Sequence, residues 1–351
     1  MGNRFDSLDG MRGICAFIVL IYHCDIALNT GHLVNSGWLC VDAFFVLSGF
    51  VIAYKYEASL QTHSGLRNFV RGRFLRLAPT LVLGYLFSAL CASVAYMKGV
   101  GLWREVPPFV LAAAAALGVL LIPLSMVPGR LHPAFADSDY PVDSPLWSLF
   151  GEVVANAFYG LVLHAFRTRT LLVIILGSWT VLLWAIFRTG EGWGATHLVP
   201  ATGRAVSEFL VGVILLRFFK VGRLNWLPSI NPVLVFAGWF FVCSLPSGPS
   251  MSWFGVFVGT VGVPLALMFL IRTERGTPAA FRWLGRVSYP LYVCHFGIVW
   301  LAMSVLPRHV GRHNIFWAVP MICAAIVAAW CIATLTEWRR KNRSVAARYA
   351  T

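Results

Sequence analysis

The chain has 351 residues, of which 58% are hydrophobic and 12% are charged. This composition excludes an ordinary soluble globular enzyme, in which about a quarter of the residues are charged, and it also excludes a disordered chain. The 28 basic and 14 acidic side chains give a net charge of +14. Because the basic residues lie between apolar stretches, this charge indicates membrane topology and not nucleic-acid binding.

The apolar stretches predict an all-α fold, namely a polytopic bundle of transmembrane helices. About 20 helical residues cross a hydrocarbon core of ~30 Å, and continuous apolar runs disfavour membrane strands. In chain order the candidate spans are 11–29, 37–54, 80–97, 109–126, 146–166, 170–187, 200–219, 231–246, 252–271, 287–306 and 315–336. Residues 1–351 are expected to form a single transmembrane domain, with no fused soluble domain and no cleavable signal peptide.

Lysine and arginine residues predict the sidedness of the bundle. Most of them lie near the N-terminus, after the second, fifth, seventh and ninth runs, and in the tail, so these parts and both termini are expected to be cytoplasmic. Two cytoplasmic termini require an even number of crossings, whereas eleven runs are present. We expect 109–126 not to span fully, because Pro107 and Pro108 precede it and Pro123 and Pro128 end it. About ten spanning helices remain.

Two ionisable residues share one face of the first candidate span. Arg12 and His23 are eleven residues apart, which corresponds to three helical turns plus about 20° and to a separation of about 16 Å along the axis. Ionisable groups inside a membrane are costly and usually functional. The alternative for His23 is a structural histidine that is hydrogen-bonded within the bundle.

Further charged residues follow in the second span and in the connection after it. Asp42, near the predicted outer end of its helix, is expected either to cap that helix or to orient His23, while Gly49 can permit close helix packing. Arg73 and Arg76 are three residues apart and hence adjacent on a helical surface. They fit either an ordinary positive-inside loop or a clamp for a polyanion such as a nucleotide pyrophosphate.

Polar residues recur at helical spacing in later spans. One stripe consists of Ser148, Glu152, Asn156 and Tyr159. A buried carboxylate at Glu152 needs an arginine or histidine partner. Another stripe consists of Ser288, Tyr292 and His295, for which a purely structural role is the alternative. Arg204 and Glu208, four residues apart, are expected to satisfy each other.

The eight cysteines lie within or beside apolar runs. None forms a CxxC pair or a Cys/His cluster with the spacing of a metal site. We therefore expect them to be small buried apolar residues, and we expect neither a metal site nor a disulfide framework.

Five segments in this order resemble the membrane-bound acyltransferase type 3 family. They are LDGMRGICAFIVLIYH, VDAFFVLSGF, RGRFLRLAP, LWSLFGE and GRVSYPLYVCH, and the resemblance covers residues 8–337. It implies a ten-helix enzyme of the bacterial inner (cytoplasmic) membrane. Such an enzyme transfers an acyl group, commonly acetyl, from acyl-CoA to a hydroxyl of a saccharide or related acceptor.

The resemblance also assigns roles to residues. Arg12 and His23 match the essential Arg/His pair of the family, and Arg73 and Arg76 match its Arg-x-x-Arg motif, which is thought to bind the phosphates of CoA. The other matching residues are Glu152, Ser288, Tyr289 and His295. The chain departs from the family at Cys40, where a glycine is usual, and near Glu337, where the usual Glu-x-Pro is replaced by LTEWRRKN.

The resulting hypothesis is direct acyl transfer with His23 as the general base, because imidazole titrates near neutrality. An acyl-enzyme route is the alternative. Arg73 and Arg76 would hold acetyl-CoA, or another acyl-CoA, from the cytoplasmic side. Ser288, Tyr292 and His295 are assigned to the same donor-binding site. Arg12 would contact the donor below His23, and either Glu152 or Asp42 would set the tautomer of His23. No metal is expected.

Several alternatives stay open at this point. The acceptor is expected to be a cell-surface polysaccharide or a glycolipid, reached among membrane lipids, but a diffusible small molecule such as a macrolide sugar is an alternative. A transporter of a polar lipid or glycan would also need charges within a bundle and would move its cargo without CoA. A non-catalytic assembly subunit would not need Arg12 and His23 on one stripe.

Overall fold

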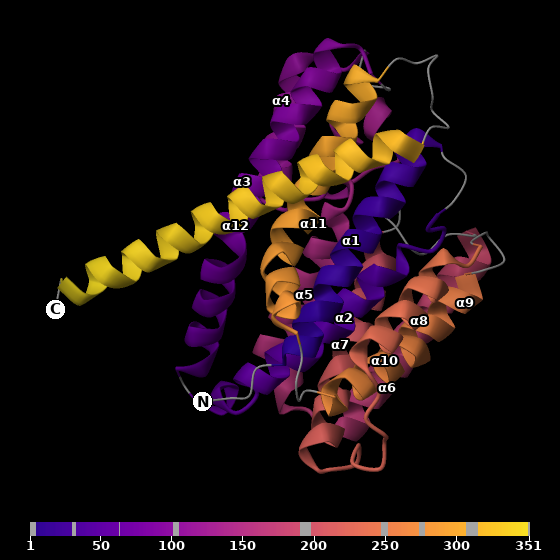
Figure 1. Cartoon of the computed structure of the whole chain (residues 1–351), viewed down its shortest axis with the longest axis vertical. Helices are drawn as coiled ribbons and strands as arrows, with labels where there is room; N and C mark the ends of the chain where they lie inside the picture. Colours follow the sequence, from indigo (N-terminus) through magenta and orange to yellow (C-terminus); the bar gives the residue numbers. More distant parts are fainter. Residues whose placement is uncertain are drawn as a thin grey trace.

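The computed structural model describes residues 5–29, 33–62, 64–100, 105–189, 198–246, 252–273, 278–306 and 315–349. These residues form a bundle of helices (Figure 1), and no strand occurs among them. The prediction of an all-α fold is therefore confirmed. A π-helical turn at Val258–Gly262 joins α9 (Ser252–Phe257) to α10 (Val263–Arg272), so these two helices form one continuous element.

The main helices follow the apolar runs of the sequence. Their bounds are α1 Asp6–Leu28, α2 Leu39–Tyr56, α3 Gly65–Met97, α4 Pro108–Val119, α5 Leu146–Leu161, α6 Thr168–Thr189, α7 Leu198–Lys220, α8 Pro232–Ser244, α9 Ser252–Phe257, α10 Val263–Arg272, α11 Ala279–Val305 and α12 Ala318–Tyr349. Each predicted span thus contains a helix, although α3 begins fifteen residues before its predicted run.

Eight helices among the described residues are long and apolar enough to cross a membrane. The chain is therefore a multi-pass membrane protein. α4 has 12 residues and spans only about 18 Å, which agrees with the expectation that 109–126 does not cross fully. α5 has 16 residues and α8 has 13, and these two would complete the predicted ten. The number of crossings and the side of the termini stay predictions.

α11 lies at the centre of one half of the bundle, where it packs against α1, α3 and α12. The other half is built on α7, which packs against α2, α5 and α6. α2 and α7 can approach closely because Gly49 has no side chain. A Cβ atom added at Gly49 would lie only 1.9 Å from the Phe209 carbonyl oxygen. The packing role expected for Gly49 is thus confirmed. α12 crosses the bundle obliquely, and its C-terminal end extends beyond the other helices (Figure 1).

Large apolar side chains cover the outside of the bundle. Examples from four helices are Leu90, Phe187, Phe241 and Val327, which are all exposed. A soluble protein rarely exposes so much contiguous apolar surface, whereas a hydrocarbon environment favours it. These helices therefore present a surface that fits lipid.

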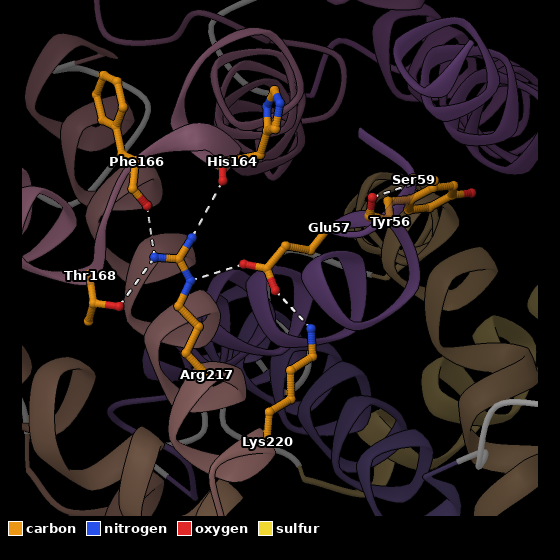
Figure 2. Close-up of polar contacts among 8 residues, drawn as sticks. All are labelled: Tyr56, Glu57, Ser59, His164, Phe166, Thr168, Arg217 and Lys220. Atoms are coloured by element: carbon orange, nitrogen blue, oxygen red, sulfur yellow. Dashed lines mark hydrogen bonds and ion pairs between the residues drawn. The ribbon is translucent and has the colours of Figure 1, made fainter. Parts of the chain in front are cut away.

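Basic residues tie three helix ends together at the end of the bundle that is predicted to be cytoplasmic (Figure 2). The Arg217 guanidinium donates to Glu57 Oε1 at 2.9 Å and to the Phe166 carbonyl at 2.9 Å. Lys220 donates to Glu57 Oε2 at 2.8 Å. Arg217 also donates to Thr168 Oγ1 at 3.3 Å. We call this set of contacts the arginine clasp. It joins the ends of α2 and α7 to the start of α6.

Candidate active site

Two connected cavities lie where α1 and α11 begin and α2 ends. The wide chamber has a volume of about 700 Å³ and is lined by α1, α2, α3, α5, α11 and α12. The narrow chamber has a volume of about 60 Å³ and continues from it into the bundle. The residues that line both chambers, and so mark their boundary, are Arg12, Val51, Arg73, Arg76, Glu152 and Tyr289. Because the narrow chamber is so much smaller than the wide one, only a slender part of a ligand can enter it.

The wide chamber has an excess of positive charge. Its basic lining residues are Arg12, Lys55, Arg73, Arg76 and Arg286, and its acidic ones are Asp9, Glu152 and Glu337. Five cations therefore face three carboxylates. Guanidinium groups suit phosphate because they donate two parallel hydrogen bonds. The chamber is thus suited to a polyanion.

At the boundary, Glu152 is the centre of a hydrogen-bonded group. Its Oε1 atom accepts from Arg73 Nη2 at 2.7 Å and from Ser48 Oγ at 2.8 Å. Arg12 lies 3.8 Å from Asp9 on its own helix. Glu152 therefore holds Arg73 in place. The expectation that Glu152 sets the tautomer of His23 is corrected, because the partner of this carboxylate is an arginine from α3.

Tyr292 lies at the inner end of the narrow chamber. Its hydroxyl is 2.5 Å from Ser148 Oγ, and its ring packs edge-on against Phe44 at a centroid distance of 5.4 Å. The same ring lies 5.8 Å from the imidazole of His295. Tyr292 thus separates the narrow chamber from the histidine region, and His23 is not among the residues that line either chamber.

His23 and His295 form a pair. His295 Nε2 lies 3.1 Å from His23 Nδ1, and His23 Nδ1 also lies 2.9 Å from the Val19 carbonyl. On the other ring, His295 Nδ1 faces the Tyr292 carbonyl at 2.8 Å and the Leu291 carbonyl at 3.2 Å. His295 is buried and His23 is half-buried. Two residues 272 positions apart in the chain therefore share one hydrogen bond.

The backbone carbonyls determine which nitrogens of this pair carry protons. A carbonyl can only accept, so His295 Nδ1 must be the donor and, in the neutral ring, His295 Nε2 is an acceptor. His23 Nδ1 then faces two acceptors and must itself carry the proton. This leaves His23 Nε2 with its lone pair, which is the form that a general base requires. Among the described residues, Nε2 has no hydrogen-bond partner.

Asp42 belongs to a different cluster. It pairs with Arg204, whose Nε also lies 3.4 Å from Glu208 Oε1. All three side chains are buried between α2 and α7. The expectation that Asp42 orients His23 is corrected, because a buried guanidinium holds this carboxylate. The pairing of Arg204 with Glu208 is confirmed, although Arg204 is shared with Asp42.

The remaining predicted residues divide between the chambers and the histidine pair. Six of them line a chamber, namely Arg12, Arg73, Arg76, Glu152, Ser288 and Tyr292. Ser288 donates its hydroxyl to the Gly285 carbonyl at 2.9 Å. His295, which was assigned to the donor-binding site, instead contacts His23. The predicted residues therefore lie in three places: at the boundary of the two chambers, along the narrow chamber, and in the histidine pair.

Among the chamber residues that sequence reasoning missed are Ser48, Lys55 and Arg286. Ser48 and Lys55 are seven residues apart on α2, so they lie on one helical face, and this polar stripe was a usable signal. Arg286 precedes Tyr289 by three residues on α11. Both basic residues had been interpreted only as indicators of topology.

The cysteines behave as expected with two exceptions. Cys323 and Cys331 on α12 are exposed, whereas the other six are buried. The sulfur atoms of Cys40 and Cys243 are 3.8 Å apart. Within the described parts of the chain, no group of three His, Cys, Asp or Glu residues is placed to hold a metal ion.

Comparison with known proteins identifies relatives of the chain. The family model described as "Acyltransferase domain" matches residues 5–334. Protein 2 in the picA locus of Rhizobium radiobacter is 35% identical over 162 residues, which are 44% of this chain and 81% of that protein. Peptidoglycan O-acetyltransferase OatA of Listeria monocytogenes is 24% identical over 357 aligned positions, which cover 92% of this chain and 53% of that protein.

The chain thus spans about half the length of OatA. No solved structure matches it. One family model extends over almost all of the chain, and the matched residues form the helical membrane bundle that holds the two chambers and the histidine pair. The protein therefore belongs to the acyltransferase type 3 family.

Proposed function

We propose that this protein is a membrane O-acyltransferase of the bacterial inner membrane, which moves an acyl group, with acetyl as the first choice, from acyl-CoA to a hydroxyl of a saccharide. The observation that carries the proposal is the basic wide chamber, which leads through a narrow one to Tyr292, and the ring of Tyr292 lies 5.8 Å from His295 of the histidine pair. A CoA thioester has this same shape, with a bulky anionic nucleotide at one end and a slender arm at the other.

In the proposed reaction, His23 Nε2 takes the proton of the acceptor hydroxyl as its oxygen attacks the thioester carbonyl. The new C–O bond forms, the tetrahedral oxyanion collapses, and the C–S bond breaks. The leaving CoA thiolate receives the proton from His23, so the imidazole returns to its starting state. The hydroxyls of Tyr292 and Ser148, at the inner end of the narrow chamber, are candidates to stabilise the oxyanion.

The direction of approach follows from the position of Tyr292. The donor arm reaches the histidine pair only past Tyr292 and Phe44, so these rings must shift when the donor binds. The acceptor would approach His23 from the side away from the chambers. The saccharide is proposed because OatA, by its name, acts on peptidoglycan. Membership of an acyltransferase family favours this enzyme over a transporter or an assembly subunit.

The test uses membrane vesicles that contain the wild type or His23→Gln, supplied with acetyl-CoA and a glycan fraction. Release of the CoA thiol and a gain of one acetyl mass in the glycan are measured. We expect the variant to lose at least about a hundredfold in rate, the lower range for a general base. A variant with wild-type transfer would exclude His23 as the base, and a wild type without acceptor-dependent thiol release would exclude the function.

A further inference from the structure

The part of the wide chamber beyond the boundary residues carries two cations of its own. Lys55 comes from the end of α2, and Arg286 from the first third of α11. Both line the wide chamber but not the narrow one. They therefore lie on the outer side of the boundary that Arg12, Arg73 and Arg76 mark between the two chambers.

Arg286 already has an anionic partner. Its Nε atom lies 2.7 Å from Glu337 Oε1, and the two side chains are 38% and 40% exposed. Lys55 lies over the ring of Tyr56 at 5.0 Å, and the described residues contain no ion pair to its amine. An exposed ion pair of this kind contributes little stability. A ligand with a stronger negative charge can therefore displace Glu337 at small cost.

The chemistry of the proposed donor places a second anionic group at this position. CoA carries its pyrophosphate between the pantetheine arm and the adenosine, and a separate 3′-phosphate on the ribose. The nucleotide cannot pass into a chamber of about 60 Å³, so it must remain in the wide one. If the pyrophosphate contacts the boundary arginines, the ribose lies further out, next to Lys55 and Arg286.

We propose that Lys55 and Arg286 bind the 3′-phosphate of the acyl-CoA donor, and that Glu337 competes with this phosphate for Arg286. The inference rests on the proposed function, because it identifies which part of that donor the outer cations recognise. A phosphate monoester carries between one and two negative charges near neutral pH, more than the single charge of Glu337. The site thereby distinguishes CoA from a donor that lacks only this phosphate.

The experiment measures binding and so does not depend on the acceptor. Purified protein in discs of neutral phosphatidylcholine is titrated by calorimetry with CoA and with dephospho-CoA, which lacks only the 3′-phosphate. The neutral lipid removes anionic headgroups as a competing source of phosphate. The variants are Lys55→Gln, Arg286→Gln, the double variant and Glu337→Gln. Arg282→Gln is the matched control, because Arg282 lies one turn away on α11 and pairs with Asp6 at 2.8 Å but lines neither chamber.

We expect the wild type to bind CoA at least about tenfold more tightly than dephospho-CoA, the effect of one or two charge-assisted hydrogen bonds. The double variant should lose this preference by weakening CoA binding alone, and its unchanged affinity for dephospho-CoA shows that it is folded. Glu337→Gln should tighten CoA binding about threefold by removing the competitor, and Arg282→Gln should change neither affinity.

Equal affinity of the wild type for both ligands would overturn the inference, and so would a preference that survives in the double variant. A second set of titrations uses discs to which anionic lipid has been added. A loss of the CoA preference only in those discs would show that the two cations bind a lipid phosphate in the membrane. Failure of the proposed function has a different signature, since it leaves the binding preference intact but gives no acyl transfer.

Discussion

The imidazole of His295 contacts His23 through Nε2 and two backbone carbonyls through Nδ1. The carbonyls of Leu291 and Tyr292 hold the proton on Nδ1, so Nε2 is left to accept from His23. This arrangement is equivalent to the carboxylate that orients a histidine in hydrolases, but it uses a neutral ring. On this interpretation His295 is a positioning residue, and the chemistry belongs to His23.

This role predicts different results for two substitutions of His295. His295→Phe removes the acceptor and should lower kcat about 10- to 100-fold, the usual cost of losing an orienting group, while KM for acyl-CoA stays within about twofold. His295→Gln keeps an acceptor oxygen and should restore part of the loss. Steady-state kinetics of thiol release measures both. An equal loss in the two variants would indicate that His295 only fills space.

At the scale of the elements, the arginine clasp ties the end of α2, which lines the wide chamber, to the end of α7 and the start of α6. α2 supplies Glu57 two residues after Lys55, and α7 supplies Arg217. The guanidinium also satisfies the Phe166 carbonyl in the turn before α6. A change in the clasp should therefore affect both the stability of the bundle and the position of Lys55.

Arg217→Ala tests the clasp. It leaves Glu57 with Lys220 alone and leaves the Phe166 carbonyl without this donor, which we expect to cost about 2 kcal/mol of unfolding free energy. Thermal unfolding in detergent measures the loss. Arg223→Ala is the control, because Arg223 is exposed after the same helix and stacks on Phe218 at 5.5 Å. Its effect should stay within about 0.5 kcal/mol. Equal unfolding temperatures for the two variants would contradict the role of the clasp.

At the scale of the whole molecule, stability should depend on pH through Asp143, which lies in the connection before α5. Burial raises the pKa of this carboxyl well above its ordinary value, whereas the unfolded chain titrates near about 3.9. The folded state therefore prefers the protonated form. The contribution of the protonated Asp143 carboxyl to stability is fully present below the unfolded pKa. This contribution is lost as the pH rises through the folded pKa.

Asp143→Asn replaces the acid with a neutral group of similar shape. The variant should be more stable than the wild type at pH 7, and the difference should shrink as the pH falls toward about 4. Unfolding temperatures across this range measure it. Asp137→Asn, a change at an exposed position of the same connection, should show no such trend. A variant that is less stable than the wild type at neutral pH would show that the charged form of Asp143 is stabilising.

The helices could be predicted from the sequence because hydrophobic length is a local property, and each apolar run contains a helix. The partners of the charged residues could not be predicted in the same way. Asp42 meets Arg204 across 162 positions, and His23 meets His295 across 272. No spacing rule covers such distances. Asp42 and Glu152, which are nearer to His23 in the sequence than His295 is, were therefore expected to orient His23, and this expectation is wrong. The proximity of Arg73 and Arg76 was predictable because they are three residues apart on one helix.

Arg12 and His23 lie on one uninterrupted helix, α1. Their separation along its axis, about 16 Å, cannot change when other helices move. In the proposed reaction α1 therefore fixes the distance between the arginine that contacts the donor and the base. An acyl donor can engage both residues only if the arm between its phosphate and its acyl group matches this length. Acyl phosphates, whose phosphate adjoins the carbonyl, are too short to engage both residues at once. The enzyme would thereby select the carrier of the acyl group by its reach as well as by its charge.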